Sequence, residues 1–174
     1  MGYVQQLDRR LTVAIGQLPR SWRPTLEIMT FLGEPLIVIA AGVGGYVAAT
    51  LRHQPAVQRA FIYALLAFAL GVGLKRVIHR SRPDQLILTS FGLKSYSFPS
   101  GHAFGSVIFY GLFAVIGSRH LNAPWESLWM AIILMAIVAI GVSRVYLGSH
   151  YPTDVIGGWI FGAIALGLIV SLTL

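Results

Sequence analysis

Long apolar runs separated by short polar stretches dominate the chain. A bilayer core about 30 Å thick is crossed by roughly 20 mostly apolar helical residues, so runs of this length predict transmembrane helices. Five segments qualify, and we predict spans over residues 26–51, 56–78, 102–118, 127–145 and 155–174. These runs are too long and continuous for the strands of a membrane barrel. The predicted fold class is therefore all-α, an integral membrane bundle of about five transmembrane helices.

The first 24 residues follow a different pattern. Apolar side chains recur there at helical spacing, so that one helical face carries Leu7, Leu11, Ile15 and Leu18. Polar side chains occupy other positions, among them Gln5, Asp8, Arg9 and Gln17. The apolar stretch is too short to span, which favours an amphipathic helix lying in the membrane interface. We therefore divide the chain into an interfacial helix, 1–24, and a transmembrane domain, 25–174.

Composition agrees with a membrane protein and narrows its partners. Only 11% of the 174 residues are charged, against about 25% in soluble domains, and the mean hydropathy is +0.72. The absence of cysteine excludes disulfides, thiolate metal sites and a cysteine nucleophile. The net charge of +7 comes from basic residues between apolar runs, without a basic-aromatic strip for stacking bases. Anionic lipid head groups or a phosphorylated substrate are thus better partners than nucleic acid.

Two groups of polar residues flank the loop between the second and third predicted spans. Lys75 and Arg82 lie seven residues apart, two helical turns, so they can share a helical face, and Pro83 ends that helix. The tetrapeptide 99–102, Pro-Ser-Gly-His, then opens the third span. The unpaired N–H groups and positive dipole end of a helix N-terminus suit an anion. Both groups favour a phosphate site.

A third group lies between the fourth and fifth predicted spans. Arg144 is followed by His150 and, four residues later, by Asp154. If this segment is helical, the imidazole and the carboxylate meet on one face, and the carboxylate holds one tautomer of the ring. Three cations, two histidines and backbone donors then gather on one side of the membrane. Such a set matches metal-free phosphoryl transfer, with one histidine as nucleophile and the other as acid.

Together these three motifs resemble the signatures of the type 2 phosphatidic acid phosphatase family, relatives of vanadium haloperoxidases. The resemblance covers residues 75–154 and implies a phosphatase that needs no metal or other cofactor. It implies that His150 attacks phosphorus, that Asp154 orients His150, and that His102 protonates the leaving oxygen. The phosphate-binding residues that it implies are Lys75, Arg82, Ser100, Gly101 and Arg144. The expected substrates are lipid monophosphates or diphosphates, such as phosphatidate, phosphatidylglycerophosphate or polyprenyl diphosphate.

Several alternatives remain open at this level. A lipid phosphotransferase would use the same site, with an alcohol in place of water. A transporter or scaffold would be favoured by a broken span, for which Gly33-Glu34-Pro35 is the candidate. Glu34 either pairs with a site arginine, contacts substrate or only distorts the helix. His150 and Asp154 could also form half of a zinc site. We expect Arg76, Arg80 and Lys94 to be solvated or to contact lipid head groups.

The membrane orientation gives conflicting signals. The predicted catalytic side carries ten basic residues, namely Arg9, Arg10, Arg20, Arg23, Lys75, Arg76, Arg80, Arg82, Lys94 and Arg144. The other side carries Arg52, Arg59 and Arg119. The positive-inside rule therefore favours a cytoplasmic site, whereas the family resemblance implies an extracytoplasmic one. We follow the resemblance and expect an extracytoplasmic site in a bacterial cytoplasmic membrane.

Overall fold

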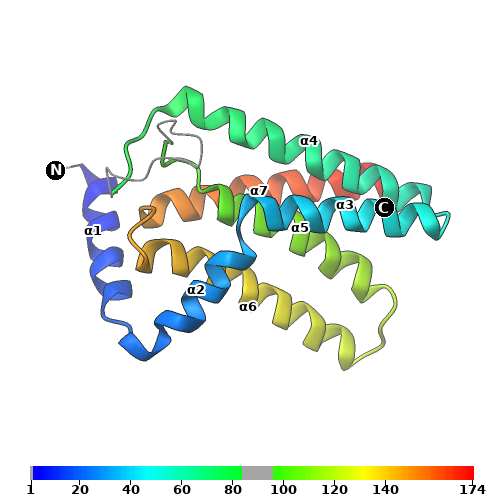
Figure 1. The fold of residues 1–174 in the computed structure, drawn as a ribbon, viewed down its shortest axis with the longest axis horizontal. Helices are drawn as coiled ribbons and strands as arrows, with labels where there is room; N and C mark the ends of the chain where they lie inside the picture. Colours follow the sequence, from blue (N-terminus) through cyan, green and yellow to red (C-terminus); the bar gives the residue numbers. More distant parts are fainter. Residues whose placement is uncertain (1, 84–95) are drawn as a thin grey trace.

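The fold is a bundle of helices, seen in a computed structural model that describes residues 2–83 and 96–174 (Figure 1). Its elements are α1 (Tyr3–Gly16), the 3-10 turn η1 (Arg20–Trp22), α2 (Arg23–Leu32), α3 (Pro35–Leu51), α4 (Pro55–Ile78), α5 (Gly101–Ser118), α6 (Trp125–Tyr146) and α7 (Pro152–Thr173). No strand occurs within the described ranges. The all-α prediction is confirmed. Lys94, which we expected to be solvated or to contact lipid head groups, lies outside the described residues.

Four helices, α4 to α7, are each long and apolar enough to cross a membrane. Among residues 2–83 and 96–174, a fifth span arises only if α2 and α3 are counted together, and these two are bent by 51° at their junction. The predicted span over 26–51 is therefore divided into two helices at Gly33-Glu34-Pro35, the site named above as a candidate break. The break follows from Pro35, which has no N–H and disfavours helical dihedrals at the residue before it. Glu34 accordingly has φ −57° and ψ 138°.

Helix α5 is the central element and packs against α6 and α7. Most of its side chains are buried, whereas α3, α4, α6 and α7 expose many large apolar side chains on their outer faces. Exposed apolar side chains on the outer faces fit a bundle whose outer surface contacts lipid. The close approach of α7 to α5 depends on Gly158, where an added Cβ would lie 2.7 Å from the Ser100 carbonyl oxygen.

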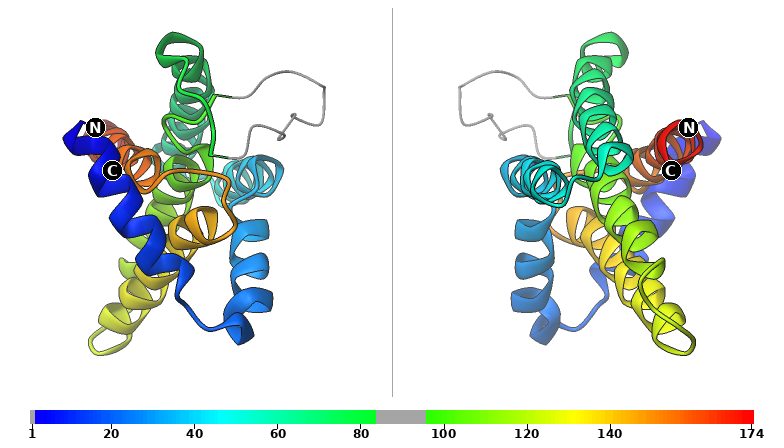
Figure 2. Two further views of the ribbon diagram at one scale, coloured as in Figure 1. Left: turned by 90° about the vertical axis from the view of Figure 1, so that its left-hand side faces the viewer. Right: turned by 90° about the vertical axis from the view of Figure 1, so that its right-hand side faces the viewer.

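Helix α1 lies across the end of the bundle where α6 ends and α7 begins (Figures 1 and 2). A helix was predicted over 1–24, but α1 ends at Gly16, so Leu18 lies beyond it. The apolar side of α1 faces the protein, where Ile15 packs against a buried cluster that includes Val145 and Val155. One position departs from the expected pattern. Asp8, which we placed on the polar face, is only 3% exposed, because it forms buried polar contacts described below.

Candidate active site

Four helix ends meet at the end of the bundle that α1 covers: the last turns of α4 and α6 and the first turns of α5 and α7 (Figure 1). The two starting helices are joined directly, since Ser100 N–H donates to the Asp154 carbonyl oxygen at 2.9 Å. Ser100 also caps α5, its Oγ accepting from Ala103 N–H at 3.5 Å. All predicted site residues belong to this end or to the neighbouring break between α2 and α3.

The three predicted phosphate-binding cations come from different segments. Lys75 lies beside the start of α5, with its Nζ 3.5 Å from where a Cβ on Gly101 would be. Arg82 donates from Nη1 to the Ser149 carbonyl oxygen at 3.3 Å. Arg144 donates from Nη1 to Thr30 Oγ1 at 2.6 Å, while its buried Nε has no partner among the residues described. Each of the two guanidinium groups thus donates to an oxygen of the protein.

Lys75 and Arg82 do not share a helical face, contrary to our expectation. Helix α4 ends at Ile78, and His79 follows in the left-handed conformation with φ 47°. A non-glycine residue in that region ends the helical repeat, so Arg82 lies on the following loop rather than two turns further along the helix. Pro83 therefore does not mark the helix end.

His150 is buried in the loop before α7, close to Asp154. The pair is not on one helix, because α7 begins at Pro152, yet His150 Nδ1 lies 3.6 Å from Asp154 Oδ2. This separation exceeds a hydrogen bond. Burial is the main cause that lowers the pKa of His150 to about 3; Asp154 opposes this shift, and the nearby charges of Lys75, Arg82 and Arg144 add to it. The ring is therefore neutral at physiological pH, as a nucleophile requires.

Asp154 is fully buried and surrounded by donors that the sequence did not reveal. Its Oδ2 accepts from Tyr151 N–H at 2.8 Å and from the Ser97 hydroxyl. Its Oδ1 accepts from Arg80 Nη1 at 2.6 Å. Arg80 was expected to be solvated or to contact head groups, and that expectation was wrong. It lies between Asp154 and Asp8, with 25% of its side chain exposed.

Glu34 stands at the break between α2 and α3 and contacts the second histidine. Its Oε1 lies 3.2 Å from His102 Nε2, and 47% of its side chain is exposed. Of the roles weighed for it, pairing with an arginine is replaced by this hydrogen bond. Gly33 lets the backbone approach, because a Cβ there would lie 3.1 Å from His102 Cδ2 and 2.5 Å from Ile140 Cγ2.

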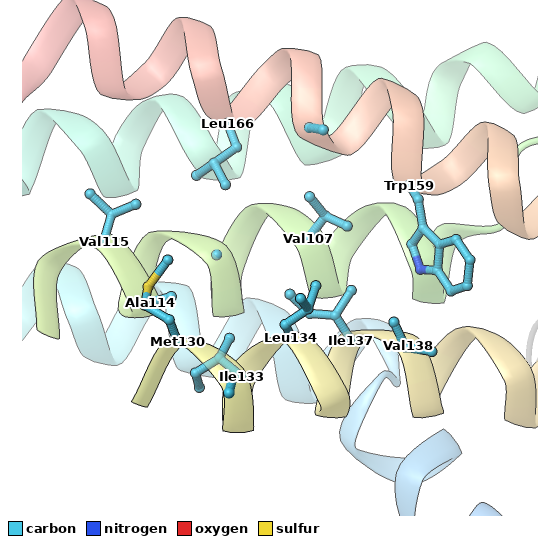
Figure 3. Close-up of a pocket in the computed structure, with 13 residues that line it drawn as sticks. Val107, Ala114, Val115, Met130, Ile133, Leu134, Ile137, Val138, Trp159 and Leu166 are labelled. Carbon is cyan, nitrogen blue, oxygen red and sulfur yellow. The ribbon is translucent and has the colours of Figure 1, made fainter. Parts of the chain in front are cut away.

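A polar cavity and an apolar groove lie near the site. A polar cavity of about 650 Å³ lies beside α1 and is lined by Gln5, Asp8, Arg9, Thr12, Val13, Arg80, Ser81 and Tyr151. An apolar groove of about 500 Å³ lies between α6 and α7 with α5 at its floor, and extends from Trp159 to Met130 (Figure 3). The groove starts only five residues beyond Asp154 in α7, so apolar surface begins close below the polar site.

A comparison of this chain with models of known protein families agrees with the arrangement of these motifs. A protein-family model described as the PAP2 superfamily matches residues 56–174. The chain belongs to the PAP2 superfamily. The matched residues contain all the predicted catalytic and phosphate-binding side chains, whereas Glu34 and Asp8 lie outside them.

Three individual relatives cover between 57% and 95% of the chain. Phosphatidylglycerophosphatase B of Bacillus subtilis is 38% identical over 95% of this chain and 83% of its own length. Lipid A 1-phosphatase of Rhizobium johnstonii is 35% identical over 60% of this chain and 43% of its own length. An undecaprenyl-diphosphatase of Sulfolobus acidocaldarius is 34% identical over 57% of this chain and 46% of its own length. The recognition of the family from its three motifs is thus confirmed.

Solved PAP2 structures share the fold. A transmembrane PAP2 type phosphatidylglycerolphosphate phosphatase from Bacillus subtilis superimposes with a TM-score of 0.79 at 27% identity, over 99% of this chain and 87% of that one. Aquifex aeolicus LpxE superimposes with a TM-score of 0.70 at 21% identity, over 95% of each chain, and shows the fold alone. The chain is therefore an integral membrane phosphatase, although it contains the broken span that we associated with transport.

Proposed function

We propose that this PAP2 protein hydrolyses lipid monophosphates or diphosphates through a phosphohistidine on His150, without a metal ion. The observation that carries the proposal is the placement of both histidines within electrostatic range of the same two cations, Lys75 and Arg144. A phosphate held by those cations would therefore lie between a nucleophile and a proton donor. The substrate class rests on the relatives, which are named for phosphatidylglycerophosphate, lipid A and undecaprenyl diphosphate.

In the first step, the free ring nitrogen Nε2 of His150 attacks phosphorus. The nitrogen lone pair forms the N–P bond while the bond from phosphorus to the lipid oxygen breaks, and His102 gives its proton to that oxygen. Asp154 faces Nδ1 and stabilises the positive charge that develops on the ring. Its 3.6 Å distance is expected to shorten when substrate binds, as catalytic hydrogen bonds often do.

In the second step, water clears the phosphohistidine. His102, now neutral, takes a proton from water, the water oxygen bonds to phosphorus, and the N–P bond breaks to release inorganic phosphate. Lys75, Arg82 and Arg144 neutralise the negative charge of the phosphate oxygens, the role that a metal ion has in other phosphatases. Among residues 2–83 and 96–174, no group of three or more histidine or carboxylate side chains is placed to hold a metal.

The direct test is phosphate release by detergent-purified protein from phosphatidate, phosphatidylglycerophosphate and polyprenyl diphosphate, in the presence of EDTA. We expect release that survives EDTA, is abolished in His150→Ala and falls by about 10⁴-fold in Asp154→Asn, by analogy with triad carboxylates. Acid-labile phosphate on the wild-type protein, trapped by rapid quenching, should be absent from His150→Ala. Turnover retained by that variant would contradict the nucleophile assignment.

We further propose that the site faces the extracytoplasmic side of a bacterial cytoplasmic membrane, as the family resemblance implies. The chain has no cysteine, so a single introduced thiol reports its side without interference. Ser81→Cys lies beside the site and Asn122→Cys on the turn between α5 and α6 at the other end, and both positions are exposed. In intact cells, a membrane-impermeant maleimide should label only Ser81→Cys. Labelling of only Asn122→Cys would place the site in the cytoplasm.

A further inference from the structure

Arg80 joins two buried carboxylates that are far apart in the sequence. Its Nη1 donates to Asp154 Oδ1 at 2.6 Å, and its Nη2 donates to Asp8 Oδ2 at 2.5 Å. The two carboxylate side chains are 0% and 5% exposed. The guanidinium also lies over the Tyr151 ring, 4.5 Å from its centroid. A planar fork can bond to both carboxylates at fixed angles, which a lysine ammonium cannot reproduce.

Asp8 also binds the first turn of α7, the helix that carries Asp154. Its Oδ1 accepts from Thr153 N–H at 2.9 Å, and its Oδ2 accepts from Thr153 Oγ1 at 2.9 Å. The first N–H groups of a helix have no partner within the helix, and a carboxylate there also interacts favourably with the helix dipole. Helix α1 therefore supplies a cap for α7 from elsewhere in the chain.

The same network reaches the other side of Asp154. The Arg80 carbonyl oxygen accepts from Ser97 N–H at 2.7 Å, and the Ser97 hydroxyl donates to Asp154 Oδ2. Arg80 thus holds one carboxylate oxygen through its side chain and supports the donor to the other through its backbone. With both oxygens occupied, the carboxylate has one orientation, and that orientation turns Oδ2 toward His150 Nδ1.

Asp8 and Asp154 share the positive charge of Arg80. Asp8 and Asp154 carry two negative charges around one guanidinium, so part of the Arg80 charge is neutralised from the α1 side. Without Asp8, the whole Arg80 charge would act on Asp154, at the expense of the stabilisation that Asp154 offers the phosphohistidine ring. Such effects are large in a buried site because the local dielectric constant is low.

We propose that Asp8 and Arg80 are positioning residues for the His150–Asp154 pair, and that α1 is part of the catalytic apparatus. This inference rests on the proposed phosphohistidine chemistry. Neither residue is proposed to touch substrate, and the phosphate-binding cations lie outside the network. Loss of Asp8 should therefore slow turnover while leaving phosphate binding nearly intact.

The test compares Asp8→Asn, Arg80→Lys and the double variant, each purified as the full chain in detergent. Active sites are counted by binding of orthovanadate, a phosphate analogue, and kcat is expressed per site. For each single variant we expect kcat to fall about 10- to 100-fold, the range typical of lost outer-shell partners, with KM and vanadate affinity changed less than two-fold. The double variant should be no slower than the slower single variant, because the two side chains act as one unit.

The matched control is Arg9→Gln, an exposed neighbour on the same helix, which should keep wild-type kcat. Unchanged kcat per site in Asp8→Asn would overturn the inference, as would a fall in vanadate-binding sites alone, because that marks a purely structural role. Wild-type protein and His150→Ala run in the same assay separate this result from the proposed function. If wild type is inactive or His150→Ala is active, the chemistry itself fails.

Discussion

The two histidines of the site are supported in opposite ways. His150 is 2% exposed and sits beside a carboxylate whose two oxygens are both bound by donors. His102 instead hydrogen-bonds Glu34, a half-exposed side chain at a break between two helices. A nucleophile must hold one tautomer and one direction through both chemical steps. A proton donor must release and regain a proton while lipid and water exchange beside it, which an open, hydrated partner allows.

The largest expected effect concerns His150, whose burial should make the stability of the protein depend on pH. His150 is buried as a neutral ring with its pKa lowered to about 3, while the unfolded chain has a histidine pKa near 6.5. The free energy of unfolding is therefore not reduced by this group above pH 6.5, and it decreases as the pH falls from 6.5 toward 3. At pH 5 the loss is on the order of 2 kcal/mol. Thermal unfolding in detergent should show a larger drop in Tm from pH 7 to pH 5 for wild type than for His150→Asn. Equal drops in the two proteins would contradict a buried neutral His150.

A smaller effect is expected at Glu34, the exposed partner of His102. Glu34→Gln keeps the shape of the side chain but removes the charge that stabilises a proton on His102. We expect about a 10-fold lower kcat with a lipid alkyl phosphate, since general acid catalysis contributes strongly when the leaving group is poor. An aryl phosphate, whose leaving group needs little protonation, should lose much less.

The control for that measurement is Glu27→Gln on the same side of the bundle. Glu27 pairs with Arg23 at 2.9 Å in an exposed i,i+4 ion pair, so its loss should leave both rates unchanged. Equal losses for alkyl and aryl phosphates in Glu34→Gln would show that Glu34 acts on substrate binding or folding rather than through His102.

Much of the site could be read from local sequence, because its residues lie in short motifs at helix ends. Ser100, Gly101 and His102 open α5 as expected, and His150 lies close to Asp154, although α7 begins between them and does not carry both as the spacing suggested. The apolar runs also predicted the bounds of α4 to α7 within a few residues. Such features depend on interactions within one or two helical turns.

The supporting residues could not be predicted, because their partners are distant in the sequence. Asp8 contacts Thr153 across 145 residues, and its only local signal is an acidic side chain next to an apolar stripe. Arg80 lies in a run of four cations from 75 to 82. The left-handed turn at His79 changes which of them face inward, and helical spacing cannot reveal that change.

The cap that α1 places on α7 also bears on how PAP2 proteins can be recombined. The residues matched by the family, 56–174, include the proposed reacting groups, yet one of the two carboxylates that Arg80 binds comes from Asp8. A chimera that joins the matched part of this chain to the amino-terminal part of a relative would inherit the motifs without their charge partner. In a chimera of two relatives, α1, Arg80 and Thr153 should therefore all come from the same parent protein.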